Sequence, residues 1–300
     1  MSDSIPNLFI VGAGKAGTYS IYSHLAKHPD IYMSPNKEPN FFGSDLHFQK
    51  TRITKDSYLA LFENSSSYKY RGEASVSYLL SKTAAKEIKD FSPEAKIIIM
   101  LRNPVDVMYA RYFQNRKFAV EPASTFEKAL EKEELRRKGK DIPKEAAIAE
   151  MLFYREWVNY TNQMEQYVKV FGWENTFVGI LDDLKEQPFD FLHQLGSFLS
   201  VTGLAEISME ATNKNTIVRS HFLNRIVRGQ VEYVKPLGRA LLPSRNLRAN
   251  LKKALSNYNL KTASRKPLDP NLTKKLKKEL TSEIENLSSF LNRDLTHWTE

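Results

Sequence analysis

Glycines surround a single lysine between residues 12 and 18, where the sequence reads Gly-Ala-Gly-Lys-Ala-Gly-Thr. A short apolar run over residues 8–11 precedes this segment, and apolar residues at helical spacing follow it. Glycines let a backbone approach a phosphate closely, and the first N–H groups and the dipole of a helix favour negative charge. Lys15 and the hydroxyls of Thr18 and Ser20 would complete this cradle. The segment therefore predicts a phosphate-binding turn between a strand and a helix.

The order of residues in this turn separates three nucleotide-binding motifs. A Walker A loop requires Gly-Lys-Ser/Thr, but here Lys15 comes before Ala-Gly-Thr, which argues against P-loop kinase or ATPase chemistry. Gly12, Gly14 and Gly17 match the Rossmann pattern G-x-G-x-x-G, so a Rossmann-type NAD(P)-dependent oxidoreductase is the alternative. That fold needs a ribose-binding acid about 20 residues further on at the end of a second strand. The sequence offers Glu38 there, between two prolines.

The elements that must hold this turn alternate between strand and helix. Apolar runs predict strands at 8–11, 96–101 and 176–181, each followed by a helix. Further helices are predicted over 125–138, 146–171 and 271–291, the second as one continuous helix. This alternation predicts a three-layer α/β fold with a central, mainly parallel sheet flanked by helices, and ligands at the carboxyl ends of the strands. We expect one domain over residues 1–300, with a helical C-terminal extension.

Positive charge is concentrated in one segment of the chain. Residues 214–278 hold 17 of the 44 Lys and Arg residues, against only Glu232 and Asp269. This asymmetry is typical of a solvated helical face or of a surface that binds a negatively charged partner. The segment also carries apolar residues, and the amphipathic pattern suggests peripheral contact with an anionic membrane surface. The apolar residues are Ile226, Val227, Leu237, Leu241 and Leu242.

The composition excludes several classes of function. The chain has no cysteine, which excludes disulfides, thiolate catalysis and cysteine-based metal sites. Its longest apolar runs fall well short of the roughly 20 residues that span a bilayer. Its six histidines form no metal-type motif. We therefore expect a cytoplasmic protein that uses no metal.

Several blocks of sequence, taken together, resemble one known family. They are Lys15-Ala16-Gly17-Thr18, His28-Pro29, Lys37-Glu38-Pro39-Asn40-Phe41-Phe42, Gly72-Glu73-Ala74-Ser75, Ser77-Tyr78-Leu79, Leu101-Arg102-Asn103-Pro104 and Leu291-Asn292-Arg293-Asp294-Leu295. These blocks closely resemble sulfotransferases that depend on 3′-phosphoadenosine 5′-phosphosulfate (PAPS). The similarity is greatest to the bacterial branch related to the heparan sulfate sulfotransferase domain. The resemblance implies a P-loop-like fold, and transfer of a sulfuryl group from PAPS to an acceptor hydroxyl by in-line displacement.

The resemblance also implies a role for individual residues. Lys15 would bind the 5′-phosphosulfate and stabilise the leaving phosphate oxygen, and Glu38 would be the general base on the acceptor hydroxyl. Arg102 would contact the 3′-phosphate of the nucleotide, and Arg219 is a candidate for the far side of the nucleotide. The residues implied to hold the 5′-phosphate are Ala16, Gly17, Thr18, Tyr19 and Ser20. One departure from the family pattern is Ala110, which stands where relatives carry a serine that binds the 3′-phosphate.

The acceptor side is less defined by the sequence. Residues near Glu38 in the matching blocks are expected to bind the acceptor, namely Lys37, Asn40, Ser75 and Tyr78. The resemblance favours a carbohydrate, glycolipid or small-molecule acceptor. We expect no nucleic-acid partner; a non-enzymatic module whose basic segment binds nucleic acid or a membrane is a second alternative. The reaction product would be 3′-phosphoadenosine 5′-phosphate (PAP).

Overall fold

The chain folds into two compact units, which are described separately. The computed structural model describes residues 4–48, 52–209, 216–228, 231, 244–262 and 266–300. Unit 1 comprises Met1–Met108, Tyr154–Thr212 and Thr273–Glu300, and unit 2 comprises Tyr109–Phe153 and Asn213–Leu272. The basic segment 214–278 falls mainly in unit 2. A single domain over residues 1–300 stays a prediction.

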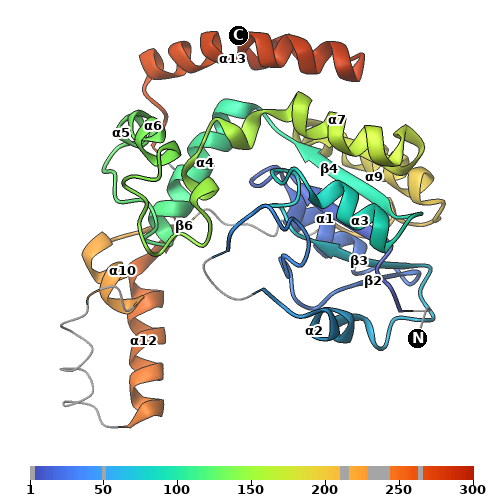
Figure 1. Ribbon diagram of the computed structural model, residues 1–300, viewed down its shortest axis with the longest axis horizontal. Helices are drawn as coiled ribbons and strands as arrows, with labels where there is room; N and C mark the ends of the chain where they lie inside the picture. The colour runs from blue at the N-terminus through green and yellow to red at the C-terminus, as the bar shows by residue number, and fades with distance from the viewer. Residues whose placement is uncertain (1–3, 49–51, 210–215, 229–230, 232–243, 263–265) are drawn as a thin grey trace. The chain divides into compact units, whose positions relative to one another are not determined.

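Unit 1 is built on a five-stranded sheet in the order β2-β3-β1-β4-β5, and every neighbouring pair is parallel (Figure 1). The strands are β1 (Leu8–Gly12), β2 (Ile31–Met33), β3 (Tyr70–Ala74), β4 (Lys96–Leu101) and β5 (Thr176–Ile180). The sequence predicted β1, β4 and β5 from their apolar runs. It did not predict β2, which is only three residues long, or β3, in which Arg71 and Glu73 interrupt the apolar pattern.

The strand order separates this sheet from the Rossmann sheet. In the Rossmann order 3-2-1-4-5-6 the second strand lies beside the first, so that its terminal acid can reach the ribose of the dinucleotide. Here β3 lies between β1 and β2. The acid that follows β2 therefore does not occupy the position that a dinucleotide fingerprint requires.

Helices flank this sheet. In unit 1 they are α1 (Thr18–Leu25), α2 (Lys55–Leu59), α3 (Ala84–Phe91), α7 (Tyr160–Phe171), α8 (Leu181–Glu186), α9 (Pro188–Leu199) and most of α13 (Pro270–Leu291), and α4 (Pro104–Lys117) begins there. α1 packs on β1, β2 and β3, whereas α7 packs on α3, β4 and β5 (Figure 1). These contacts confirm the predicted α/β class with a central parallel sheet.

One predicted helix was wrong. Residues 146–171 do not form a continuous helix, because the 3-10 turns η2 (Ala149–Leu152) and η3 (Glu156–Val158) precede α7. Consecutive residues 152–154 are all buried, as are Trp157 and Val158. An amphipathic helix would bury only one stripe of such a segment. Tertiary burial of adjacent residues therefore overrides the helical periodicity seen in the sequence.

Unit 2 contains helices and a small antiparallel sheet. Its elements include the part of α4 from Tyr109 onward, α5 (Phe126–Glu131), α6 (Glu133–Arg137), β6 (Thr216–Val218), α10 (His221–Val227), α12 (Arg245–Asn259) and β7 (Leu260–Thr262). Arg136 donates to both carboxylate oxygens of Glu121 at 2.7 and 2.8 Å, and both side chains are fully buried. Leu237, Leu241 and Leu242 of the predicted amphipathic stretch lie outside the described residues.

Candidate active site

The glycine-rich turn connects the central strand β1 to the N-terminus of α1. Gly17 is the N-cap residue, with φ 87° and ψ 7°, and no side chain caps the helix. A Cβ at this position would lie 2.7 Å from Cδ1 of Leu181, so both the backbone conformation and the space require glycine. The first amides of an uncapped helix lack intrahelical acceptors and attract anions. The predicted turn between a strand and a helix is therefore present at the carboxyl end of β1, and its binding of phosphate stays a prediction.

Arg102 lies beside the same turn because it follows β4, the neighbour of β1 in the sheet. Its Nη1 donates to the carbonyl oxygen of Lys15 at 3.4 Å, and its Nη2 donates to Oδ2 of Asp106 at 2.7 Å. The hydroxyl of Tyr160 donates to the carbonyl oxygen of Arg102 at 3.0 Å. Lys15 has a left-handed backbone with φ 72°. The guanidinium of Arg102 thus contacts the backbone of the turn at Lys15, a residue 87 positions earlier in the chain.

The remaining turn residues differ in what they offer to a ligand. The side chains of Ala16 and Thr18 are buried, so Ala16 contributes its backbone. Tyr19 is exposed and its ring lies 6.1 Å from the ring of Tyr22. The amide of Ser20 donates to the carbonyl oxygen of Gly17 at 2.9 Å inside the helix, which leaves its hydroxyl as the predicted contact group.

Glu38 lies in a strained loop beside the end of β3. Its amide donates to the carbonyl oxygen of Ala74 at 2.9 Å, and its φ is 63°. Asn40 also has a left-handed backbone, with φ 52°. The Glu38 side chain is 43% exposed and pairs with Nζ of Lys37 at 3.2 Å. A half-exposed ion pair contributes only about 1 kcal/mol or less, so the position of Glu38 depends on how its backbone is held.

Ser75 and Tyr78 form hydrogen bonds to the backbone of this loop. Oγ of Ser75 accepts a hydrogen bond from the amide of Asn40 at 3.1 Å. The hydroxyl of Tyr78 accepts from the amides of Phe41 and Phe42 at 2.9 and 3.3 Å. Both side chains are buried. Ser75 and Tyr78, which were predicted to bind the acceptor substrate, therefore lie against the Glu38 loop. In the structure they contact the backbone of that loop.

The structure adds Glu73, to which the sequence analysis assigned no role. Its carboxylate is completely buried and accepts from Tyr78 at 2.7 Å, from Tyr58 at 2.9 Å and from Ser75 at 2.7 Å. Burial raises the pKa of Glu73 to about 7, against the opposing effect of these hydrogen bonds, and the charge of Glu38 adds to the rise. In the sequence, the indication of a role for Glu73 would have been its position as an acidic residue within a buried strand. That indication was missed because β3 was not predicted.

Other predicted features have these positions. Arg219 belongs to unit 2, where its guanidinium lies 5.6 Å from the ring centroid of Tyr258 and its amide donates to the carbonyl oxygen of Asn259. Its contact with a nucleotide stays a prediction. Ala110 is buried in α4. Within the described ranges, no group of three or more His, Asp or Glu residues could hold a metal ion. No helix in that part of the chain has the length and apolar character needed to cross a bilayer.

Curated relatives share the part of the chain that contains this site. Bifunctional heparan sulfate N-deacetylase/N-sulfotransferase 1 of Xenopus laevis is 24% identical over 209 residues, which cover 67% of this chain and 23% of that protein. Human heparan sulfate glucosamine 3-O-sulfotransferase 6 is 30% identical over 109 residues, which cover 36% of this chain and 30% of that protein. The chain thus spans less than a third of the length of either relative.

A solved structure and a family model extend the similarity to most of the chain. The crystal structure of a sulfotransferase from Alicyclobacillus acidocaldarius matches with a TM-score of 0.72 and 26% identity, covering 98% of this chain and 99% of that one. This match confirms the predicted fold class and does not favour the Rossmann alternative. The model of the sulfotransferase domain matches residues 6–231, which include the turn, the Glu38 loop, Glu73 and Arg102. The chain therefore belongs to the sulfotransferase domain family.

Proposed function

We propose that the protein transfers a sulfuryl group from PAPS to a hydroxyl of its acceptor. The observation that carries this proposal is the meeting of Lys15 and Arg102 at the uncapped mouth of α1, with the Glu38 loop at the end of the adjacent strand β3. The residues fit a nucleotide with two separate anionic groups. A lysine suits a leaving group whose charge develops during reaction, and the planar guanidinium of Arg102 suits a stationary phosphate.

The chemistry divides between the two sides of this site. Bound PAPS supplies the sulfuryl group. The ammonium of Lys15 stabilises the negative charge that develops on the leaving phosphate oxygen. The backbone of residues 16–19 and the hydroxyl of Ser20 hold the 5′-phosphate. Glu38 accepts the proton of the acceptor hydroxyl, a contribution of about 10² to 10⁴ in rate. The acceptor oxygen forms a bond to sulfur as the bond from sulfur to the phosphate oxygen breaks, and PAP leaves.

For the acceptor we propose a carbohydrate or glycolipid hydroxyl. Support for a carbohydrate comes from the relatives, several of which are heparan sulfate or carbohydrate sulfotransferases by name. Support for a hydroxyl comes from the 3-O-sulfotransferase, whereas the N-sulfotransferases are named for transfer to nitrogen. Lys37 and Asn40 flank Glu38, and the side-chain amide of Asn40 donates to the Glu38 carbonyl oxygen at 2.8 Å. These two residues are the proposed acceptor contacts nearest to the base. A sulfuryl group carries less charge than a phosphoryl group, so the proposed reaction uses amide and lysine donors and no metal.

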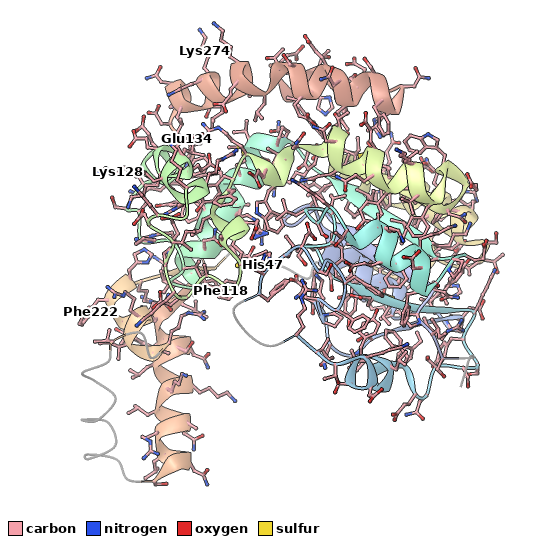
Figure 2. The ribbon with its side chains drawn as sticks, in the orientation of Figure 1. His47, Phe118, Lys128, Glu134, Phe222 and Lys274 are labelled. Atoms are coloured by element: carbon pink, nitrogen blue, oxygen red, sulfur yellow. The ribbon has the colours of Figure 1, made fainter. Side chains whose placement is uncertain are left out.

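We also propose peripheral contact of unit 2 with an anionic membrane surface. On α12, Leu247, Leu251 and Tyr258 are 57%, 45% and 70% exposed, and they recur at helical spacing beside Lys252 and Lys253. Phe222 of α10, a helix that packs against α12, is 66% exposed (Figure 2). Flotation with phosphatidylserine-containing liposomes tests this contact. Equal recovery of the wild type and the L247E/L251E variant with these liposomes would refute it.

Sulfate transfer itself is tested with labelled PAPS and a panel of carbohydrate, glycolipid and small-molecule acceptors, scored by the mass increment of one sulfate. We expect at least one acceptor to be modified by the wild type, and the Glu38→Gln variant to be strongly impaired. A thermal-shift titration separates the proposal from the Rossmann alternative, because PAP should stabilise the protein and NAD should not. Stabilisation by NAD alone would overturn the proposed function.

A further inference from the structure

The backbone of residues 40–42 is joined to one buried carboxylate through two hydroxyl groups. Ser75 accepts from the Asn40 amide and donates to Oε2 of Glu73 at 2.7 Å. Tyr78 accepts from the Phe41 amide and donates to Oε1 of Glu73 at 2.7 Å. Each hydroxyl therefore accepts a hydrogen bond from a loop amide and donates one to the carboxylate.

The direction of these bonds follows from the single proton that each hydroxyl carries. Ser75 and Tyr78 both donate that proton to the carboxyl oxygens of Glu73. Their lone pairs then face the loop amides. Burial, and after it the charge of Glu73, hold the pKa of Tyr78 well above its ordinary value, so this hydroxyl keeps the proton that it donates. Replacing one carboxylate oxygen by an amide nitrogen would force at least one hydroxyl to reverse.

Other contacts hold the following part of the loop. Arg52 donates to the carbonyl oxygens of Phe41, Phe42, Gly43 and Leu46. The carboxylate of Glu87 accepts from the amides of Gly43 and Ser44 at 2.7 and 3.0 Å. These contacts fix residues 41–46 from the C-terminal side. The two left-handed residues, Glu38 and Asn40, lie N-terminal to them, and each such conformation costs about 1–2 kcal/mol unless it is held.

We infer that Glu73 is a positioning residue for Glu38, acting through the hydroxyls of Tyr78 and Ser75 on the backbone of residues 40–42. The inference rests on the proposed role of Glu38 as general base. Glu73 does not touch the substrate, because its carboxylate is fully buried beneath the loop. Its function is to hold the strained loop so that the exposed carboxylate of Glu38 meets the acceptor hydroxyl in one orientation.

Tyr58 provides a matched control, because it also donates a hydrogen bond to Glu73. Tyr58 donates to the same Oε1 of Glu73 at 2.9 Å, and its buried ring stacks on Phe41 with a centroid distance of 4.3 Å. Its hydroxyl has no hydrogen bond to a loop amide among the contacts of the described residues. Tyr58→Phe and Tyr78→Phe therefore each remove one buried hydroxyl from Glu73 and leave the ring in place. Only the second change removes the link to the loop.

The first measurement follows the loop itself and does not depend on activity. Hydrogen–deuterium exchange is measured for the peptide that covers residues 38–42. The wild type is compared with four variants, Tyr78→Phe, Ser75→Ala, Glu73→Gln and Tyr58→Phe. We expect Tyr78→Phe, Ser75→Ala and Glu73→Gln to accelerate exchange in this peptide by about tenfold or more, and Tyr58→Phe to leave it within about twofold. Equal exchange in the two tyrosine variants would overturn the inference.

The second measurement follows catalysis with PAPS and the acceptor found in the panel. We expect Tyr78→Phe to lower kcat by about 10²-fold, the scale of a small misplacement of a reacting group, with the KM for PAPS changed by less than about twofold. Tyr58→Phe should lose less than about threefold in kcat. The same kcat in both variants would refute the inference. If Glu38→Gln keeps full activity, the proposed function fails instead, whatever the exchange data show.

Discussion

The raised pKa of Glu73 makes the stability of unit 1 depend on pH in a predictable direction. The pKa is 4.5 in the unfolded chain and about 7 in the folded protein, because burial disfavours the charged form. Between these values the unfolded chain loses the proton and the folded protein keeps it. The folded state therefore binds more protons, and stability falls as pH rises from about 4.5 to about 7 and then levels off.

The magnitude follows from the same two values. Since each pKa unit corresponds to about 1.4 kcal/mol, the Glu73 carboxyl should lower the free energy of unfolding by roughly 2 to 3 kcal/mol between pH 5 and pH 8. The side chain is fully buried, so solvent does not screen the effect. Glu73→Gln removes the titrating group and should abolish this part of the pH dependence, whatever constant offset in stability it introduces.

Denaturant unfolding monitored by tryptophan fluorescence measures this effect. All three tryptophans of the chain, Trp157, Trp173 and Trp298, belong to unit 1, so the signal follows the unit that contains Glu73. The difference in unfolding free energy between the wild type and Glu73→Gln should change by roughly 2 to 3 kcal/mol from pH 5 to pH 8. Parallel pH curves for the two proteins would refute the reasoning.

A second carboxyl provides a control of opposite sign. Burial of Glu87 acts to raise its pKa, but hydrogen bonds from Ser44 and Thr83 and from nearby amides outweigh it and lower the pKa below the ordinary value. The stability that this group contributes is present above pH 4.5 and is lost as pH falls through the folded pKa. Glu87→Gln should therefore leave the decrease between pH 5 and pH 8 in place.

The remaining predictions concern the turn and its neighbours. Lys15→Ala should lower the rate of sulfate transfer by about 10²–10³-fold with an unchanged circular dichroism spectrum, and full turnover would exclude the proposed role. Arg102→Ala should raise the Kd for PAP, measured by calorimetry, by about 10- to 100-fold, because a charge-assisted contact is lost; an unchanged Kd would remove Arg102 from the site. Gly17→Ala should lower the melting temperature more than Gly203→Ala. Both glycines have φ above 80°, but only the Cβ at Gly17 would collide with Leu181; equal shifts would contradict the steric argument.

Local sequence was sufficient for the parts of the protein that local interactions decide. The turn from Gly12 to Thr18 was predicted because glycine positions and a following helical pattern are properties of adjacent residues. The strands β1, β4 and β5 were predicted because each is a short apolar run. The final helix, predicted over 271–291, is present as α13 with nearly the same bounds.

Tertiary structure decided which of these parts meet. The order β3-β1-β4 brings the Glu38 loop and Arg102 to either side of the turn, and no local pattern encodes which strands are neighbours. It also decided that Glu73, an ordinary charged residue in the sequence, is buried beneath that loop. The raised pKa of Glu73 follows from its exclusion from water. Only the packing of β3 against β1 and β2 and the burial of Tyr58 and Tyr78 establish that exclusion.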